Sequence, residues 1–493
     1  MSMKYNTLVE NVRVVRPGQD STVERDVAMA NGKFAAVEPE IQRSEAGEVV
    51  DADGLLGFPG AVDAHTHVGI YEHISEDAPT ETGAAVTGGV TTMLDYVRTG
   101  SLYLDRPGPL SEFFDELLTE SRNRFYTDYG FHVSPIQGSQ IDEMEHLAAE
   151  MGCPNFGEIF MFYGIHGLHG SSDEQHEWLM LDEGDNYDLA HFDLICRNAS
   201  HLEGEHPEMA DDLAVSFHCE TPELLREYEP MIREETDLEG LEAYSAARPP
   251  HSEAIAISVV GEMAHQAGLS NVNILHITSR EAVDAAVRCE KAYPDVEFGL
   301  ETTAGHLLLD YERAPQPWAK VNPPIRSPED REYLWDRVED GTLEWVITDN
   351  ANCPREMKVD QDDPEDIWGA KAGFGGSRFL LPGIYSEATA RDLSPNRVAE
   401  LVAGKPAKRF GLYNKGDVAE GYDADLALLD PDERWTISVE DSLSDQGYSP
   451  FEGLEITGRV KHTFLRGDRV YKDGDVIGEP QGEFLKRPYG SDN

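Results

Sequence analysis

The sequence predicts an α/β fold, a (β/α)8 TIM barrel that carries a small β-sandwich built from the N- and C-terminal segments. Short apolar runs alternate with helical stretches between residues 57 and 385. Five elements place histidines or carboxylates at or near the ends of such runs, and Glu158 alone begins its run rather than following it. Active sites of (β/α)8 barrels lie at the carboxyl ends of the strands, so a barrel explains both observations.

The expected barrel strands are rich in β-branched and aromatic residues and are bounded by turn signals. They cover residues 57–64, 90–96, 128–134, 158–163, 213–218, 271–277, 296–301 and 344–348. Helices are expected at 109–122, 139–151, 251–267 and 279–292. A doubly wound open sheet is the alternative, but it would leave the first and the eighth strand at opposite edges.

Both ends of the chain predict short strands separated by turns such as Asn31-Gly32 and Asp473-Gly474. These strands are expected at 7–9, 12–15, 27–29 and 34–37, and again at 424–429, 460–465 and 469–471. We therefore expect four regions along the chain. They are the N-terminal half of the β-sandwich (1–56), the barrel (57–385), closing helices with the C-terminal half of the β-sandwich (386–480) and a C-terminal tail (481–493).

The charge balance indicates a halophilic, cytoplasmic protein. The 493 residues include 94 acidic and 40 basic side chains, and the net charge is −54. Molar salt shortens the Debye length to about 3 Å and screens the resulting self-repulsion. No basic patch is present to neutralise phosphates, so a nucleic-acid partner is not expected.

Cysteine usage and hydropathy point to the same compartment. The five cysteines form no CxxC pair, which predicts free thiols rather than a disulfide framework or a zinc ribbon. The N-terminus has no secretory pattern, and no apolar run reaches the length of a membrane span. We expect no membrane partner.

The clearest chemical signal is the run Asp63-Ala64-His65-Thr66-His67 at the end of the first barrel strand. Residues i and i+2 of a strand point to the same side, so the two imidazoles can hold one metal ion. Further candidate ligands accompany later strands at Glu158, His218, His276 and Asp349. Together these residues predict a metal-dependent hydrolase.

At this point the sequence resembles the cyclic amidohydrolases, in particular the dihydropyrimidinase and D-hydantoinase branch. The resemblance covers nearly the whole chain, in motif order. The motifs are Pro59-Gly60-Ala61-Val62-Asp63-Ala64-His65-Thr66-His67, Gly88-Gly89-Val90-Thr91-Thr92-Met93, Asn322-Pro323-Pro324-Ile325-Arg326 and Ser449-Pro450-Phe451-Glu452-Gly453-Leu454.

The resemblance implies two divalent metal ions. His65, His67 and Asp349 would hold one ion, and His218 and His276 the other. Zinc is the expected metal, with manganese, cobalt or nickel as alternatives.

One position departs from the family pattern. The family bridges its metals with a carboxylated lysine, whereas this chain has Glu158 there, so no carboxylated lysine is expected. A glutamate is shorter by roughly 3–4 Å. Either the backbone moves inward or only one metal binds tightly. The competing interpretation is a decayed site.

The implied reaction is hydrolysis of a cyclic amide by a metal-activated hydroxide, which opens the ring to an N-carbamoyl product. Dihydropyrimidines, hydantoins and similar ring ureides are the expected substrates. Asp349 would transfer the proton, Tyr163 would stabilise the oxyanion and bind substrate, and Asn322 would contact substrate through its loop. Asn350 and Lys371 depart from the family pattern and put its usual substrate in doubt.

Three alternatives stay open. Allantoinase is the closer enzymatic one. Dihydroorotase is less favoured because Val68-Gly69-Ile70 lacks its arginine, although Arg98 or Arg378 could supply a charge. The third is a non-catalytic scaffold, which the retained ligands disfavour. Relatives suggest a homotetramer. The polar segment 164–212, with His166, His169 and His176, is expected to form a lid or a subunit contact.

Overall fold

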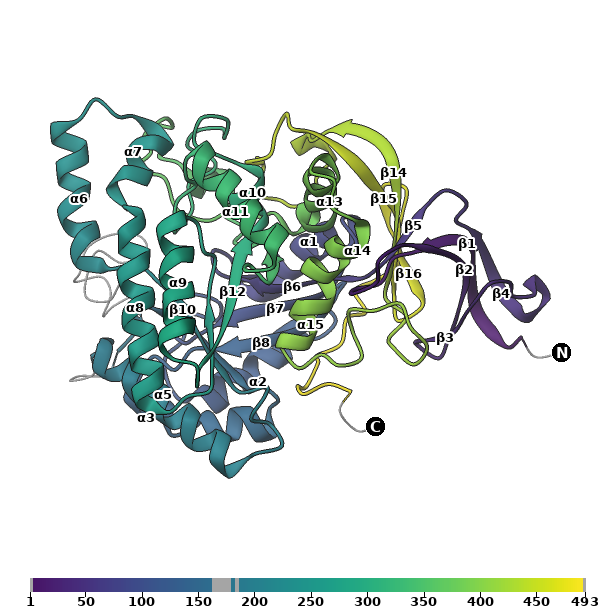
Figure 1. Ribbon diagram of the computed structural model, residues 1–493, viewed down its shortest axis with the longest axis horizontal. Helices are drawn as coiled ribbons and strands as arrows, with labels where there is room; N and C mark the ends of the chain where they lie inside the picture. The colour runs from purple at the N-terminus through teal and green to yellow at the C-terminus, as the bar shows by residue number, and fades with distance from the viewer. Residues whose placement is uncertain (1–2, 162–178, 182–185, 491–493) are drawn as a thin grey trace.

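The computed structural model describes residues 3–161, 179–181 and 186–490, and a parallel barrel forms its centre. Eight strands follow one another in sequence order around this sheet (Figure 1). They are β6 (Ala61–Thr66), β7 (Val90–Val97), β8 (Asp128–Val133), β9 (Asn155–Phe160), β10 (Ala214–His218), β11 (Asn271–Ile274), β12 (Glu297–Thr303) and β13 (Trp345–Ile347). The predicted fold class is confirmed.

The first and the last barrel strands meet at their carboxyl ends. The backbone N–H of Asp349 donates to the carbonyl of His65 at 3.0 Å, and that of His67 donates to the carbonyl of Asn350 at 2.7 Å. Asp63 accepts hydrogen bonds from the backbone and the hydroxyl of Thr348. An open sheet would not allow this contact, and it places the first and the last candidate ligands side by side.

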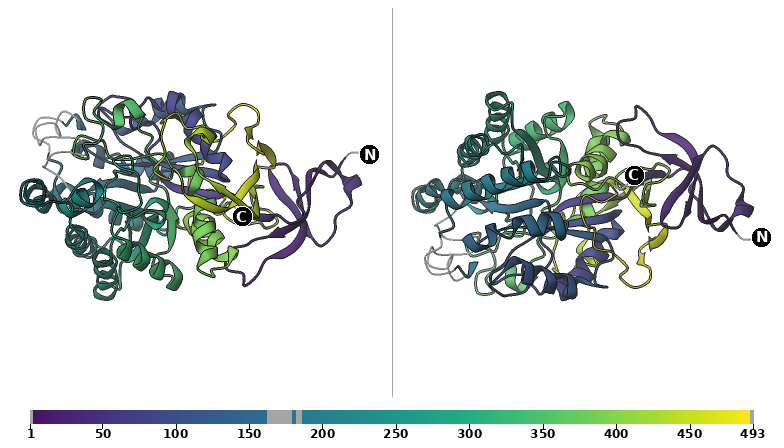
Figure 2. Two further views of the ribbon diagram at one scale, coloured as in Figure 1. Left: turned by 90° about the horizontal axis from the view of Figure 1, so that it is seen from above. Right: turned by 90° about the horizontal axis from the view of Figure 1, so that it is seen from below.

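Helices connect successive strands and cover the outside of the barrel (Figures 1 and 2). They are α1 (Ile74–Thr87), α2 (Leu110–Ser121), α3 (Gly138–Ile141), η2 (His146–Glu150), α5 (Leu189–Glu205), α6 (Pro222–Glu235), α7 (Gly240–Ala247), α8 (Pro250–Ala267), α9 (Arg280–Ala292), α10 (Ala304–Leu308) and α11 (Pro328–Asp340). The helix expected at 139–151 is broken into α3 and a π-helical turn, η2.

Shorter helices close the barrel after β13. They are α12 (Arg355–Lys358), η3 (Ser377–Phe379), α13 (Leu380–Ala390), α14 (Pro395–Ala399), η4 (Glu400–Gly404) and α15 (Lys405–Arg409). The largest apolar cluster fills the space between the strands and these helical layers.

Both chain termini contribute to a second, separate sheet, which lies at one end of the molecule in all views (Figures 1 and 2). Its strands are β1 (Tyr5–Val14), β2 (Val23–Ala30), β3 (Lys33–Glu38), β4 (Ala46–Asp51), β5 (Leu56–Pro59), β14 (Leu426–Thr436), β15 (Glu455–Leu465), β16 (Asp468–Lys472) and β17 (Asp475–Val476), with the short helices η1 (Arg43–Glu45) and η5 (Val439–Asp441) between them. The two expected strands 7–9 and 12–15 form one strand, β1, with an irregularity between Val9 and Val12.

The strand expected at 57–64 is two strands that belong to different sheets. Residues Leu56–Pro59 form β5, which pairs with β1 and β14 of the terminal sheet. The barrel strand β6 begins at Ala61. Gly60 lies at the transition, where a Cβ would lie 2.1 Å from the Thr91 hydroxyl oxygen. A continuous apolar run cannot reveal such a change of partner.

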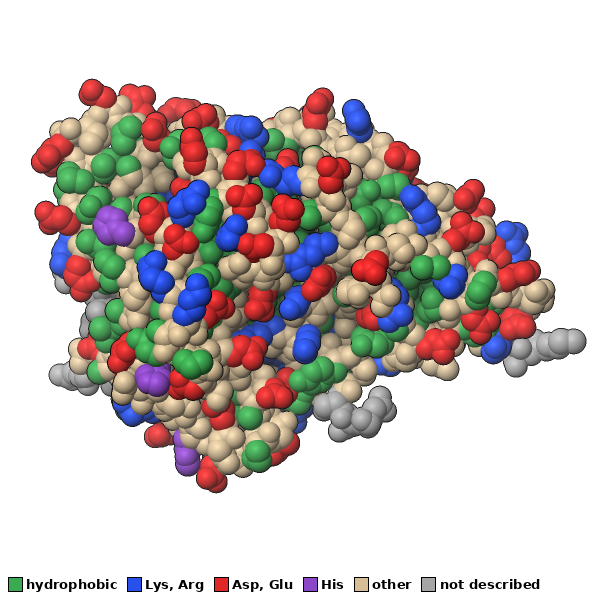
Figure 3. Space-filling model, in the orientation of Figure 1, with side chains coloured by type: hydrophobic (Ala, Val, Ile, Leu, Met, Phe, Trp, Pro, Cys, Tyr) green, Lys and Arg blue, Asp and Glu red, His purple; other side chains and the backbone are tan. Residues whose placement is uncertain are grey.

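The surface agrees with the charge balance of the sequence. Acidic side chains are distributed over the whole visible face, with basic ones between them (Figure 3). Within the described part of the chain, no helix combines the length and the apolarity needed to cross a membrane. The segment 482–489 hydrogen-bonds to the barrel, for example through Leu485 N–H and the Tyr129 carbonyl at 2.7 Å.

Candidate metal centre and active site

Three predicted ligands meet where β6 and β13 end. His65 Nε2 and His67 Nε2 lie 3.2 Å apart. One Asp349 carboxylate oxygen lies 3.4 Å from His65 Nε2 and 3.2 Å from His67 Nε2. Two imidazole nitrogens this close repel each other unless a proton or a cation lies between them. This donor set therefore fits a divalent cation.

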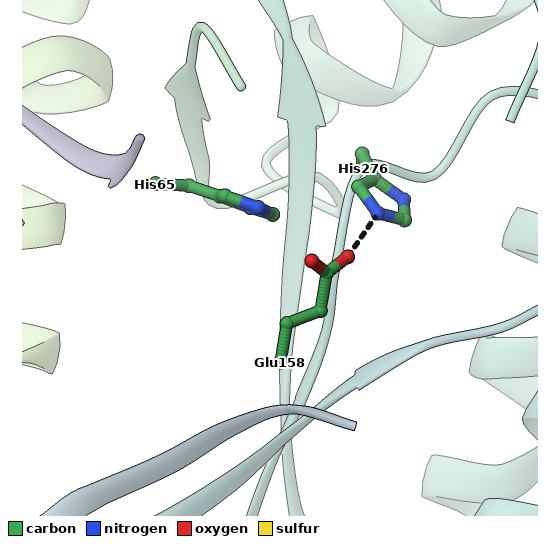
Figure 4. A group of neighbouring side chains, drawn as sticks. All are labelled: His65, Glu158 and His276. Atoms are coloured by element: carbon green, nitrogen blue, oxygen red, sulfur yellow. Dashed lines mark hydrogen bonds and ion pairs between the residues drawn. The ribbon is translucent and has the colours of Figure 1, made fainter. Parts of the chain in front are cut away.

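Glu158 connects this group to the other two histidines. One of its carboxylate oxygens lies 2.9 Å from His218 Nδ1 and 3.1 Å from His276 Nε2. The other oxygen lies 3.4 Å from His67 Nε2. In Figure 4 the side chains of His65, Glu158 and His276 point toward one another. Glu158 thus lies between the two predicted ligand groups.

A β-bulge gives Glu158 this position. The pairing of β9 with β10 shifts between Val215 and Phe217, so that Gly157 and Glu158 together oppose one residue, Ser216. Bulges re-aim a side chain. Gly157 has φ 155°, and a Cβ there would lie 2.8 Å from the Ser216 carbonyl oxygen. Only glycine fits this close approach without a backbone shift.

The predicted strand 158–163, which would begin at Glu158, has the wrong start. Strand β9 begins at Asn155, so Glu158 lies near the carboxyl end of its strand like the other candidates. Gly157 interrupts the apolar pattern, but the chain uses it for a bulge rather than for a turn.

Three of the four histidines have a buried outer partner, and sequence reasoning did not find these partners. His65 Nδ1 lies 2.8 Å from Glu301, His67 Nδ1 lies 3.0 Å from the Tyr103 hydroxyl, and His218 Nε2 lies 2.8 Å from Glu220. Such partners fix the tautomer and the ring orientation of metal-binding imidazoles. The His-Cys-Glu spacing, which puts Glu220 on the same side as His218, was the one available signal.

Charge within the group supports the same interpretation. Burial alone would raise the pKa of Glu158, but hydrogen bonds from His218 and His276 hold this pKa well below its usual range. Burial would lower the pKa of His65, yet Glu301 and Asp349 raise it to about 9. The buried carboxylates therefore demand positive charge, which protons or metal ions can supply.

A cleft opens beside these groups. It is lined by the polar residues His67, Glu158, His218, Asn322 and Asp349, and by Ile70, Tyr71, Phe160, Val321, Ala351, Ala372 and Gly373. The Tyr244 hydroxyl donates to the Asn322 side-chain oxygen at 2.5 Å and fixes that side chain. The predicted substrate loop thus borders the predicted metal site.

The remaining predicted residues do not all lie at this site. Tyr163, His166, His169 and His176 lie outside the described residues, while part of the expected lid segment forms helix α5. Arg98 is buried, and its guanidinium lies 4.9 Å from the centre of the Phe160 ring in the cleft wall. Arg378 lines a different cavity.

Asn350, which departs from the family pattern, has a structural role. Its side-chain oxygen accepts hydrogen bonds from the backbone N–H groups of Gly376 and Ser377 at 2.6 and 3.2 Å. Its amide donates to Glu81 at 3.1 Å. This side chain connects the loop after β13 to helix α1 rather than facing the cleft.

Comparison with known proteins found a family model and related sequences that match this chain. The amidohydrolase family model matches residues 326–470. An allantoinase of Rubrobacter xylanophilus is 30% identical over 488 residues, which are 98% of each chain. An allantoinase of Salmonella choleraesuis is 28% identical over 492 residues, 98% of this chain and 99% of that one.

Solved structures show the same fold. The dihydropyrimidinase of Brevibacillus agri superposes with a TM-score of 0.82 at 24% identity and covers 98% of both chains. An L-hydantoinase (dihydropyrimidinase) of Arthrobacter aurescens gives a TM-score of 0.83 at 24% identity, over 97% of this chain and 99% of that one.

Proposed function

This chain belongs to the amidohydrolase family, and on that premise we propose that it hydrolyses a cyclic ureide, with allantoin as the first candidate substrate. The observation that carries the hydrolase assignment is the convergence of His65, His67, Glu158, His218, His276 and Asp349 at the carboxyl ends of the barrel strands. Allantoin ranks first because relatives named allantoinase align over nearly the entire chain.

Hydantoins and dihydropyrimidines are the second candidate. Allantoin is itself a hydantoin ring with a ureido substituent, so one site could open both. The solved neighbours named for these rings support the shared barrel. The substituent contacts that would separate the substrates come from loops around the cleft.

We propose that the site takes two divalent cations, with zinc first. His65, His67 and Asp349 would hold one, His218 and His276 would hold the other, and Glu158 would be a ligand to both. Such ions would lower the pKa of water and polarise the ring carbonyl. The residues of the chain supply the remaining chemistry.

Asp349 is the proposed proton carrier. Its side chain is 12% exposed and borders the cleft. Burial would raise its pKa, but the charges of His65 and His67 keep this pKa below the usual range, so that the carboxylate is ionised. Water adds across the ring C–N bond. Its oxygen joins the carbonyl carbon, and Asp349 carries a proton from the water to the released nitrogen.

Asn322 and Tyr163 are the proposed substrate contacts. Asn322 and its neighbour Val321 line the cleft together with Ala372 and Gly373, and the Tyr244 hydroxyl holds the Asn322 side chain in place. A planar ureide offers N–H and C=O groups that backbone groups of such a cleft can bind. Tyr163 would stabilise the oxyanion through its hydroxyl.

The test is metal analysis combined with a substrate panel. The protein, purified in molar KCl, should contain close to two divalent ions per chain and should open allantoin faster than hydantoin, dihydrouracil or dihydroorotate. A chelator should abolish ring opening, and zinc or manganese should restore it. A folded, metal-loaded protein that opens none of these rings would overturn the proposal and would favour the scaffold alternative.

A further inference from the structure

Two lysines are buried beside the cleft, which is unusual in a chain with a net charge of −54. Lys320 is 6% exposed and Lys358 is 0% exposed. Among the described residues, neither forms an ion pair with a carboxylate within 4.0 Å. Buried ammonium groups are costly unless their donors are satisfied, so their partners need an explanation.

Carbonyl oxygens surround Lys320. Its Nζ donates to the backbone carbonyls of Ile367, Trp368 and Ala370 at 2.8, 3.0 and 2.5 Å. The ammonium also lies 4.6 Å from the centre of the Tyr244 ring, an additional favourable contact. Lys320 is thus held like a bound cation, with three carbonyls of one turn as its ligands.

Lys358 is held in the same way by two other carbonyls. Its Nζ donates to the backbone carbonyls of Lys320 and Gly373 at 2.9 and 2.7 Å. Burial lowers the pKa of both amines to about 7. Their carbonyl partners oppose this shift because a carbonyl oxygen can only accept hydrogen bonds and therefore favours the charged donor.

The two lysines close the segment 358–373 onto the substrate loop. The backbone N–H of Lys371 donates to the Lys358 carbonyl at 2.8 Å, and that of Gly373 donates to the Lys320 carbonyl at 3.0 Å. Ala372 and Gly373 end this segment and line the cleft. Residues 321 and 322, directly after Lys320, line the same cleft, and the hydrogen bond between Gly373 and Lys320 holds the two stretches side by side.

We propose that Lys320 and Lys358 are positioning residues whose ammonium groups fold segment 358–373 and hold its end, Ala372 and Gly373, beside Val321 and Asn322, so that both stretches line the substrate cleft. The inference rests on the proposed function, because it assigns these two stretches to substrate binding. Neither ammonium touches a proposed metal ligand. The two lysines therefore act on substrate affinity and not on metal content.

The experiment compares Lys320→Met and Lys358→Met with Lys408→Met. Lys408 is exposed on α15, outside the site, and is the matched control. For the cyclic ureide that the wild type opens, each buried-site variant should raise KM at least about tenfold, should change kcat less than KM and should keep the metal content. The two stretches would contact the bound ring throughout the reaction, so their displacement removes uniform binding. The control should match the wild type in all three quantities.

Hydrogen exchange provides a readout that needs no substrate. Both buried-site variants should accelerate exchange at the backbone amides of Lys371 and Gly373, while the amides of the barrel strands keep their protection. If the wild type opens no cyclic ureide, the proposed function fails, and the exchange result still decides whether the lysines fold this segment. Unchanged exchange together with an unchanged KM would overturn the inference, and so would loss of metal.

Rescue covers the case of a variant that does not fold. Lys358→Ala, refolded in propylammonium chloride, should regain activity because the free ammonium can occupy the vacated space between the two carbonyls. The neutral n-propanol should not rescue it. Equal effects of the two additives, or no rescue of a folded Lys358→Ala, would refute a role for the ammonium charge.

Discussion

Glu158→Gln tests the central assignment, that a glutamate bridges the two ligand groups. The substitution keeps the size of the side chain and removes its charge. One carboxylate oxygen lies within about 3 Å of both His218 and His276, at 2.9 and 3.1 Å. We treat the Glu158 carboxylate and a bound cation as two unit charges about 4 Å apart, which attract each other by about 4 kcal/mol at an effective dielectric of about 20. Since about 1.4 kcal/mol is tenfold in affinity, metal binding should weaken at least about 1,000-fold.

The assay is metal content after dialysis, followed by competition titration with a zinc chelator of known affinity. Glu158→Gln should retain one ion per chain or none, and ring opening should fall in proportion. Glu150→Gln, an exposed glutamate just before the same strand, is the matched control and should keep both ions. An unchanged metal content in Glu158→Gln would refute the bridging role.

Glu158→Lys extends the same reasoning to the family's usual bridge. A lysine could be carboxylated, but from this backbone the shorter Glu158 already lies 2.9 Å from His218 and 3.1 Å from His276. The longer side chain should therefore overfill the centre. We expect an inactive variant that bicarbonate does not rescue. Activity restored by bicarbonate would show that the centre has room for the family's longer bridge.

Three further predictions test the surroundings of the site and the surface. Gly157→Ala should lower metal content, because its Cβ would lie 2.8 Å from the Ser216 carbonyl oxygen, whereas Gly204→Ala has open space and should match the wild type by metal analysis. Burial raises the pKa of Glu81 to about 7, so the folded state holds a proton that the unfolded chain releases above about pH 4.5. Stability from this group should therefore fall as pH rises from about 4.5 to about 7. Denaturant titrations of Glu81→Gln should show a decline in unfolding free energy over this pH range that is smaller by up to about 3 kcal/mol. If the unfolding free energy depends on pH as in the wild type, the raised pKa of Glu81 is contradicted. The midpoint temperature of thermal unfolding should be higher in about 3 M KCl than in about 0.2 M KCl, since salt screens the net charge of −54. A midpoint that does not change with KCl would argue against halophilic adaptation.

The sequence predicted the barrel well because its evidence was periodic and repeated. Alternating strands and helices identify the fold class, and the candidate ligands lie near the carboxyl ends of strands in the structure, as predicted for all of them except Glu158. The split at Gly60 could not be predicted, because the run 57–62 is apolar on both sides of Gly60 and both strands are buried. Only tertiary partners distinguish a strand of the terminal sheet from a strand of the barrel.

The outer partners were hidden for a different reason. Glu301 and Tyr103 lie 236 and 36 residues from the histidines that they contact. No local pattern marks them, because their role follows from the closure of the barrel. The bulge at Glu158 was equally hidden, since glycine in a strand is compatible with a turn, an end or a bulge.

These hidden features bear on whether the replacement of lysine by Glu158 reflects a decayed site. Decay would remove selection on groups whose only use is to orient the ligands. In this chain Glu220 is fully buried and is held between His218 Nε2 at 2.8 Å and the Arg248 guanidinium at 2.7 and 2.9 Å. Burial works to raise the pKa of Glu220, yet the charges of Arg248 and His218 lower it well below the usual range.

A buried ion pair of this kind contributes little to stability compared with apolar side chains of the same volume. Its place beside His218 is better explained by the orientation of that imidazole for the metal binding proposed above. Glu158 itself lies within hydrogen-bond distance of His218 and His276, so the shorter side chain reaches both imidazoles from the bulged strand. Both observations support the proposed metal centre over a decayed site, and the metal content of Glu158→Gln decides between the two.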